Sequence, residues 1–252
     1  MNRTVRKIGF HAGWVTFVVL AVVIFAFSSK RFDEIKCSQI VVKYAGRQMI
    51  RLSEKELIRL VRSGNQQILG NKMENIDTEA IERIVSKNGA ILKADAYKTI
   101  VRDSTGYKGA LTIKVRHRTP YVRIFSSDGS YYMDKTGSRI PVSVQYAADV
   151  PVATGNISTE MAKKELIPFV EFIQKNRFWK AQIKQIQVNS AGELILTTLV
   201  GNQLIEFGTT ENMEKKFRNL RAFYEQVLKD NNWNKYTRII LKFDNQVIAK
   251  KS

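Results

Sequence analysis

The sequence predicts an α+β protein: a single N-terminal transmembrane helix, then a β-α-α-β-β unit, then a C-terminal mixed β domain with flanking helices. Three observations carry this prediction. A long uncharged apolar segment lies near the N-terminus, a strand-helix-helix-strand-strand order follows it, and the last third alternates short strands with one amphipathic helix. With 44% hydrophobic and 25% charged residues over 252 positions, the composition is that of a globular chain with a core.

Residues 8–29 contain no Asp, Glu, Lys or Arg over 22 positions, which is roughly 33 Å of helix. A bilayer core needs roughly 20 such residues, so this segment is predicted to span a membrane. The alternative is a cleaved signal peptide, because Ala26-Phe27-Ser28 resembles a small-x-small cleavage site. The apolar run exceeds the usual signal-peptide core of roughly 7–15 residues, which favours an uncleaved anchor.

Positive charges on both sides of this segment predict its orientation. Arg3, Arg6 and Lys7 precede it, and Lys30 and Arg31 follow it. The small excess of positive charge before the segment favours a cytoplasmic N-terminus, with the remainder of the chain on the outer side of the inner (plasma) membrane. The predicted parts are a cytoplasmic tail at residues 1–7, the span at residues 8–29, a first external domain at residues 30–118 and a second external domain at residues 119–252.

The net charge of +18 comes from 41 Lys and Arg against 23 Asp and Glu. Such a balance favours anionic partners, but the basic residues are spread along the chain without a block of five. A basic solvated surface is therefore favoured over a polyanion groove, and an external bulk argues against nucleic acid. The single cysteine excludes an intramolecular disulfide, and two histidines are too few for a histidine-based zinc site.

The first external domain begins with an alternating strand over residues 35–44. Ser53 and Glu56 fit a capping box at the start of a helix that Gly64 ends. A polar loop is predicted over residues 65–75. A second helix over residues 77–88 and strands over 91–102 and 109–118 then complete this domain.

The second external domain is predicted to be rich in strands. Pro168 interrupts a helical pattern over residues 158–176 and predicts a kink or two short helices. Residues 212–230 form an amphipathic helix, and residues 238–248 form a last strand. The other strands are expected at 121–125, 131–134, 139–142, 151–154, 183–189, 193–200 and 203–207.

No catalytic motif for hydrolases, nucleotide binding or metal-dependent proteolysis occurs. His117, between Arg116 and Arg118, is predicted to be an exposed residue at a strand end, with its charged form disfavoured by these neighbours. Asp128 and Asp134 flank a predicted hairpin and are ordinary turn formers. The sequence therefore predicts no enzyme, cofactor, metal or small-molecule substrate. A glycosidase acting on cell wall is the disfavoured third alternative.

Several segments, in order, resemble the bacterial cell division family FtsQ/DivIB. Val115, Arg118 and Pro120 fit the family's junction V-x-E-R-x-P-V-A, although Arg116-His117 replaces its acidic residue. Asp134 and Gly137 fit the following hairpin. Two C-terminal segments also resemble the family, residues 204–208 and 238–244, with Lys242 and Phe243 where Arg and Tyr are common. The resemblance implies a polypeptide-transport-associated (POTRA) domain before the β domain.

The resemblance further implies a divisome scaffold at the division septum. Such a scaffold would bind the division proteins FtsB and FtsL, and other divisome membrane proteins, outside the cytoplasm. The expected route is β-augmentation, in which an exposed edge strand accepts a partner strand through main-chain hydrogen bonds. The predicted edge is the last strand, whose residues are Arg238, Ile239, Ile240, Leu241, Lys242, Phe243, Asp244, Asn245, Gln246, Val247 and Ile248.

Alternation along this strand lets one face pack while the other stays wet. Lys242 and Lys250 are expected to attract an acidic partner segment. The alternative function is a membrane-anchored POTRA protein that assists polypeptide export or envelope assembly.

Overall fold

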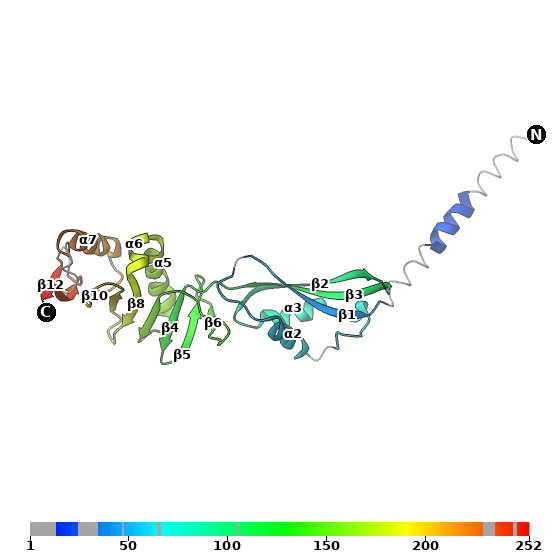
Figure 1. The fold of residues 1–252 in the computed structure, drawn as a ribbon, viewed down its shortest axis with the longest axis horizontal. Helices are drawn as coiled ribbons and strands as arrows, with labels where there is room; N and C mark the ends of the chain where they lie inside the picture. Colours follow the sequence, from blue (N-terminus) through cyan, green and yellow to red (C-terminus); the bar gives the residue numbers. More distant parts are fainter. Residues whose placement is uncertain are drawn as a thin grey trace, which may run out of the picture. The chain divides into compact units, whose positions relative to one another are not determined.

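The computed structural model covers the chain in seven described segments (Figure 1). They are residues 14–24, 35–46, 48–64, 67–104, 106–228, 235–243 and 246–251. The chain divides into two compact units, which are described separately. Unit 1 comprises Met1–Ala45 and Ser53–Arg116, and unit 2 comprises Gly46–Leu52 and His117–Ser252.

The predicted membrane span is described only in part. Residues 14–24 are helical and exposed, whereas the rest of the predicted segment 8–29 lies outside the described residues. Within the described segments, no helix has the length and apolarity needed to cross a bilayer.

Unit 1 has a three-stranded sheet in the order β1-β3-β2 (Figure 1). The central strand β3 pairs in parallel with β1, and the two helices α2 and α3 contact each other. Its elements follow the predicted strand-helix-helix-strand-strand order: β1 Cys37–Tyr44, α2 Glu54–Arg62, the 3₁₀ turn η1 Met73–Asn75, α3 Thr78–Ser86, β2 Ile91–Asp103 and β3 Gly106–His117.

Local chemistry explains why the helices of unit 1 begin where they do. The predicted capping box is present: the Ser53 hydroxyl accepts from the Glu56 N–H, and the Glu56 carboxylate accepts from the Ser53 N–H. Asp77 caps α3 by accepting from the Ala80 N–H. The apolar stripes of α2 and α3 are buried, with Leu57 and Ile81 both fully inaccessible to solvent.

Residues 67–75 depart from the polar loop that the sequence predicts over residues 65–75, and residues 65–66 lie outside the described residues. Ile68 and Met73 are buried, and η1 occupies the end of this segment. The Cys37 N–H donates to the Asn71 carbonyl, and the Met73 N–H donates to the Ile35 carbonyl, so the segment is bonded to the start of β1. Because these bonds join residues far apart in sequence, local polarity could not predict them.

Unit 2 is built on a nine-stranded mixed sheet in the order β12-β11-β10-β9-β8-β7-β4-β5-β6 (Figure 1). The parallel pairs are β4–β7, β7–β8 and β10–β11, and the others are antiparallel. The strands are β4 Val122–Ser126, β5 Gly129–Met133, β6 Arg139–Pro141, β7 Val152–Gly155, β8 Ile183–Val188, β9 Leu194–Thr198, β10 Leu204–Gly208, β11 Tyr236–Ile240 and β12 Ile248–Lys251.

Helices connect two of the parallel pairs, as parallel strands require a crossover. Between β7 and β8 run α4 Thr159–Met161, the π-helical turn η2 Ala162–Leu166, α5 Ile167–Lys175 and α6 Arg177–Gln182. Between β10 and β11 runs α7 Met213–Gln226; the end of its predicted range, residues 229–230, lies outside the described residues. Phe169, Trp179 and Phe217 from these helices join Phe207 of β10 in one buried core.

The irregularity predicted at Pro168 is present as a π-helical turn rather than a break. Pro168 lies in the first turn of α5, and the Ile167 N–H donates five residues back to the Ala162 carbonyl. Proline has no N–H and crowds the carbonyl four residues before it. The wider π turn changes the hydrogen-bond spacing just before the proline.

The α+β class, the β-α-α-β-β order and the mixed C-terminal sheet with its helices agree with the sequence prediction.

Candidate partner-binding edge

The predicted last strand, residues 238–248, is not one strand. Its first residues belong to β11, which lies inside the sheet between β10 and β12, and its last residue begins β12. The prediction of a continuous edge strand was therefore wrong. Alternation reports which face of a strand is buried, but it does not report whether the chain later turns back and covers the strand's edge.

Of the eleven predicted residues, nine are described, and these fall into three groups of three. Arg238, Ile239 and Ile240 lie in β11, and Leu241, Lys242 and Phe243 follow it. Gln246, Val247 and Ile248 lie at or just before the start of β12. Asp244 and Asn245 lie outside the described residues.

β12 is one end of the sheet among the described residues. It pairs antiparallel with β11 through Ile240↔Ile248, Ile239↔Ala249 and Arg238↔Lys250, and no described strand pairs with its other side. The opposite end of the sheet is β6, a three-residue strand that contains Pro141. Proline cannot donate to a ladder, so β12 is the more open edge for a new strand.

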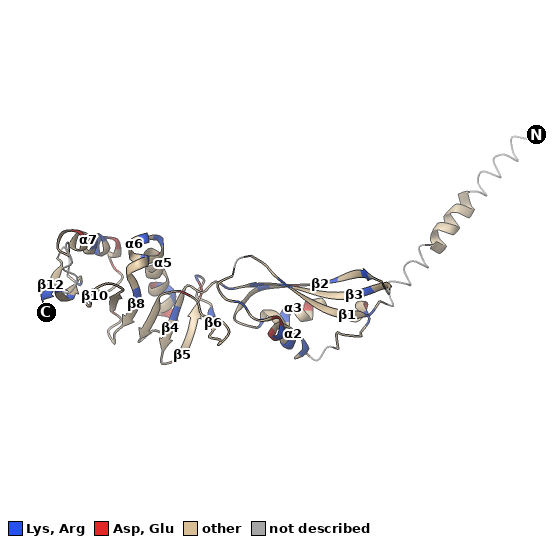
Figure 2. Ribbon diagram, in the orientation of Figure 1, with Lys and Arg blue, Asp and Glu red and all other residues tan. Residues whose placement is uncertain are grey.

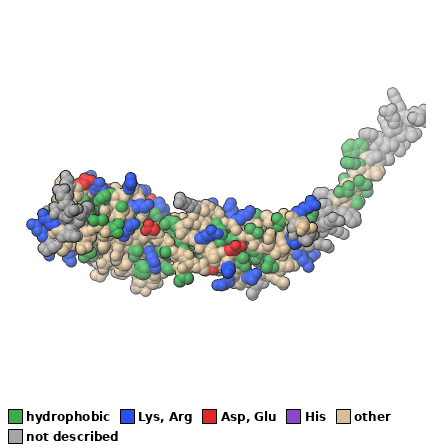
Figure 3. All heavy atoms as spheres, in the orientation of Figure 1, with side chains coloured by type: hydrophobic (Ala, Val, Ile, Leu, Met, Phe, Trp, Pro, Cys, Tyr) green, Lys and Arg blue, Asp and Glu red, His purple; other side chains and the backbone are tan. Residues whose placement is uncertain are grey.

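The two faces of this edge differ in character. Ile239 is completely buried, and Ala249 lies opposite it on the same face. The other face carries Ile248, which is 40% exposed, together with the exposed Arg238 and Lys250. Figure 2 marks lysine and arginine positions on the ribbon near the C-terminus, and Figure 3 shows basic side chains at this end of the molecule. The wet face thus combines one exposed aliphatic side chain with basic groups.

Acidic side chains from neighbouring strands engage part of this positive charge. Arg238 pairs with Glu206 at 2.8 Å, and Lys242 pairs with Glu193 at 2.6 Å and with Glu206 at 3.8 Å. The Lys242 hydrogen bond, aided by one from Asn189, holds the pKa of Glu193 below its ordinary value. Lys242 is therefore occupied within the sheet.

Lys250 and Lys251 at the end of β12 differ from Lys242. No ion pair joins either of them to another described residue. Of the two lysines expected to attract an acidic partner, Lys242 is thus already paired with acidic side chains, whereas Lys250 has no ion pair with a described residue. Residues 249–251 were missed as strand residues because a four-residue strand with two lysines has almost no apolar periodicity.

Leu241 and Phe243 also differ in what they contribute. Leu241 is 2% exposed, and its N–H donates to the Glu206 carbonyl at 2.9 Å, so it extends the bonding of β11 to β10. Phe243 is 55% exposed. Phe243 can therefore be replaced without opening the core, whereas Leu241 cannot.

The junction motif at the start of unit 2 holds a second polar cluster. Asp134 is buried and accepts hydrogen bonds from Thr136, Ser138 and Arg118, the last at 2.8 Å. Burial alone would raise the pKa of Asp134, but these hydrogen bonds outweigh burial and lower it. Gly137 has φ +79°, so the cluster organises the turn that the sequence predicted at this hairpin.

The prediction that His117 is exposed was wrong. Its side chain is 4% exposed, and Nε2 accepts a hydrogen bond from the Leu52 N–H at 3.0 Å. Burial, assisted by the charge of Arg51, lowers the pKa of His117 to about 4. The neighbouring arginines misled the prediction, because side chains of adjacent strand residues point to opposite faces.

Comparison with known proteins follows this division of the chain. A sequence model described as FtsQ/DivIB, C-terminal related, matches residues 119–250. The chain belongs to this FtsQ/DivIB-related family. A second model, for a POTRA-like domain, matches residues 31–103, within which lies most of the β-α-α-β-β order of unit 1. The chain therefore combines a POTRA-like domain with an FtsQ/DivIB-related C-terminal domain.

One curated relative is the "Cell division protein FtsQ" of Salinibacter ruber, which is 27% identical over 166 residues. The match covers 61% of this chain and 64% of that protein. Among solved structures, POTRA1-2 of the periplasmic domain of Omp85 from Anabaena covers 65% of this chain and 94% of its own. That similarity has 12% identity and a TM-score of 0.26.

Proposed function

We propose that this FtsQ/DivIB-related chain is a membrane-anchored, non-enzymatic scaffold of the division machinery. In this proposal residues 8–29 anchor the chain, residues 30–118 and 119–252 lie outside the cytoplasm, and the site of action is the septum. Membership of the family and a relative named as a cell division protein support the division role. The observation that carries the mechanism is the open edge of β12.

The recruitment step is strand addition to β12. A partner strand would extend the sheet through main-chain hydrogen bonds, each worth on the order of 1 kcal/mol net. Ile248 offers it an apolar contact, and Lys250 and Lys251 favour an acidic segment. By resemblance to the family, the partners are FtsB-like and FtsL-like division proteins. In this proposal β11, which contains Arg238, Ile239 and Ile240, supports the edge strand β12 from inside the sheet.

Proline substitutions test main-chain pairing directly. Successive N–H groups of a strand point to opposite sides, so Ala249→Pro or Lys250→Pro removes a donor on the outer side of β12. One of the two variants should reduce capture of the FtsB-like partner at least tenfold in a pull-down from membranes. Lys250→Ala is the matched control and should reduce capture several-fold less than that proline variant.

A thermal-unfolding measurement on each variant separates a lost partner strand from a damaged sheet. Capture by both proline variants at the wild-type level, in protein that remains folded, would rule out pairing at β12. Phe243→Ala extends the test to the residues after β11, because this exposed side chain can be removed without opening the core.

Cellular experiments test the division role itself. Depletion of the protein should give filaments without septa, and a fluorescent fusion should form bands at midcell. Normal division after depletion contradicts the proposal. The POTRA-like match supports one alternative, a protein that assists polypeptide export or envelope assembly. That alternative predicts a uniform envelope signal and co-purification of exported polypeptides.

A further inference from the structure

The start of β1 is fixed to the end of unit 1 that carries the β2–β3 turn. The Gly109 N–H of β3 donates to the Lys36 carbonyl at 3.0 Å, and the Ser38 hydroxyl donates to the Gly109 carbonyl at 3.1 Å. A Cβ on Gly109 would lie 2.4 Å from the Met73 sulfur, so the strands and the 3₁₀ turn meet closely there. The β2–β3 turn therefore lies at the same end of unit 1 as Ile35.

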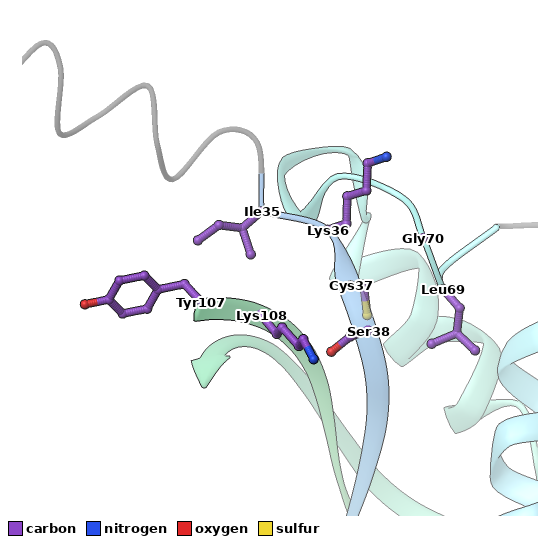
Figure 4. Close-up of a pocket in the computed structure, with 8 residues that line it drawn as sticks. All are labelled: Ile35, Lys36, Cys37, Ser38, Leu69, Gly70, Tyr107 and Lys108. Atoms are coloured by element: carbon purple, nitrogen blue, oxygen red, sulfur yellow. The ribbon is translucent and has the colours of Figure 1, made fainter. Parts of the chain in front are cut away.

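This end carries exposed apolar side chains beside a hollow of about 670 Å³ (Figure 4). Tyr107 is 61% exposed and extends outward from the start of β3, and the Arg102 guanidinium lies 5.8 Å from the centre of its ring. Leu69 and Ile100 are also exposed. Exposed aromatic and aliphatic groups of this kind suit the interface between water and lipid better than open water.

The charged residues that line this hollow are all basic. Of the eight residues that line it, two are lysines, Lys36 and Lys108, and none is acidic. The exposed Lys72 forms a β-bridge with Lys36, and the exposed Arg102 lies over the ring of Tyr107, the residue before Lys108. Basic clusters beside an aromatic side chain are attracted to anionic lipid headgroups.

The covalent chain limits how far this end can lie from a membrane. Five residues lie between the predicted end of the span at Ser29 and Ile35, and the six extended steps from Ser29 to Ile35 reach about 20 Å at most. An anchor at residues 8–29 would therefore hold Lys36, Arg102 and Lys108 within reach of the headgroup layer.

We propose that this end of unit 1, Lys36, Leu69, Arg102, Tyr107 and Lys108, binds the anionic headgroup surface of the bilayer that anchors the chain. The inference rests on the membrane anchor in the proposed function. Such contact would hold the POTRA-like domain on the membrane by its turn end, with the opposite end of β2 directed away from the lipid.

A depth measurement on the full chain in vesicles tests this proposal. In a Cys37→Ala background, a nitroxide on Ser104→Cys reports on the β2–β3 turn, and one on Lys87→Cys reports on the far end of β2. Both positions are exposed. In vesicles containing phosphatidylglycerol, the label at 104 should be at least threefold less accessible to a water-soluble nickel chelate than the label at 87. In detergent the two labels should be similarly accessible.

Charge variants identify the groups responsible. Lys36→Gln, Arg102→Gln and Lys108→Gln together should abolish the protection of the label at 104. The matched control, Lys43→Gln, Lys55→Gln and Lys114→Gln, removes the same charge from exposed positions of unit 1 outside the turn end and should retain it.

Each contrary result has a distinct meaning. Equal protection in purely phosphatidylcholine vesicles would overturn the anionic part of the proposal. Equal accessibility of the two labels in protein that floats with vesicles would overturn the contact while leaving the anchor and the scaffold role intact. Failure of the protein to float would overturn the anchor, and this inference with it.

Discussion

His117 illustrates how one residue links sequence, burial and pH response. Its ring is buried against the Leu52 N–H, which requires an unprotonated Nε2. Because the folded pKa is about 4 and the ordinary value is 6.5, the unfolded chain binds more protons between these values. Stability from this residue is therefore complete above pH 6.5 and is lost as the pH falls towards 4.

The first prediction concerns this pH dependence. The wild-type protein should lose unfolding free energy between pH 7 and pH 4, and His117→Gln should make this loss smaller by up to about 3 kcal/mol in urea unfolding. This figure is the difference between the two pKa values multiplied by roughly 1.36 kcal/mol per unit. The chain has one other histidine, so His11→Gln is a direct control and should leave the profile unchanged. Identical profiles for wild type and His117→Gln would contradict the buried neutral state.

The second prediction compares two Asp–Arg pairs of similar geometry. Asp134 and Arg118 are only 8% and 23% exposed, whereas Asp128 and Arg139 are 53% and 41% exposed. Asp134→Asn leaves Arg118 without its carboxylate and should lower the unfolding free energy by about 2 kcal/mol or more. Asp128→Asn should cost less than about 1 kcal/mol, and equal losses in denaturant unfolding would refute the difference in burial.

At the scale of elements, α7 shows how a periodic pattern becomes a core contact. Phe217 packs against Phe169, Trp179 and Phe207, with ring centroids 4.9–5.5 Å apart. The same helical stripe continues to Val227, which is 36% exposed. The pattern thus identified the inward face of the helix, while the packing decides which of its residues contribute most to the unfolding free energy.

The third prediction follows from this contrast along α7. Phe217→Ala should lower the unfolding free energy of unit 2 by about 3–5 kcal/mol, because it leaves a cavity among aromatic rings. Val227→Ala, at the exposed end of the stripe, should cost less than about 1 kcal/mol. Chemical denaturation measures both, and a loss below 1 kcal/mol for Phe217→Ala would show that α7 does not anchor this core.

At the scale of the whole molecule, the chain divides into two units with separate cores. Ile113 of β3 is completely buried in unit 1, and the large aromatic cluster belongs to unit 2. Domains with their own cores can unfold separately. The predicted division into residues 30–118 and 119–252 can therefore be tested by unfolding.

The fourth prediction is that unit 1 and unit 2 unfold in separate transitions. Ile113→Ala should destabilise unit 1 by about 2–4 kcal/mol and expose its amides to hydrogen exchange, with the amides of β8 and β9 still protected. Phe217→Ala should produce the reverse pattern. Parallel loss of protection in both units for either variant would indicate one cooperative domain.

The sequence by itself determined most elements and their buried faces. The Ser53–Glu56 capping box, the stripe of α7 and the irregularity at Pro168 depend on residues a few positions apart, so local patterns report them. Only the tertiary structure decided that His117 is buried and that β12 rather than β11 is the edge of the sheet. Both depend on pairing between distant segments, and strand alternation contains no information about which neighbour a strand will have.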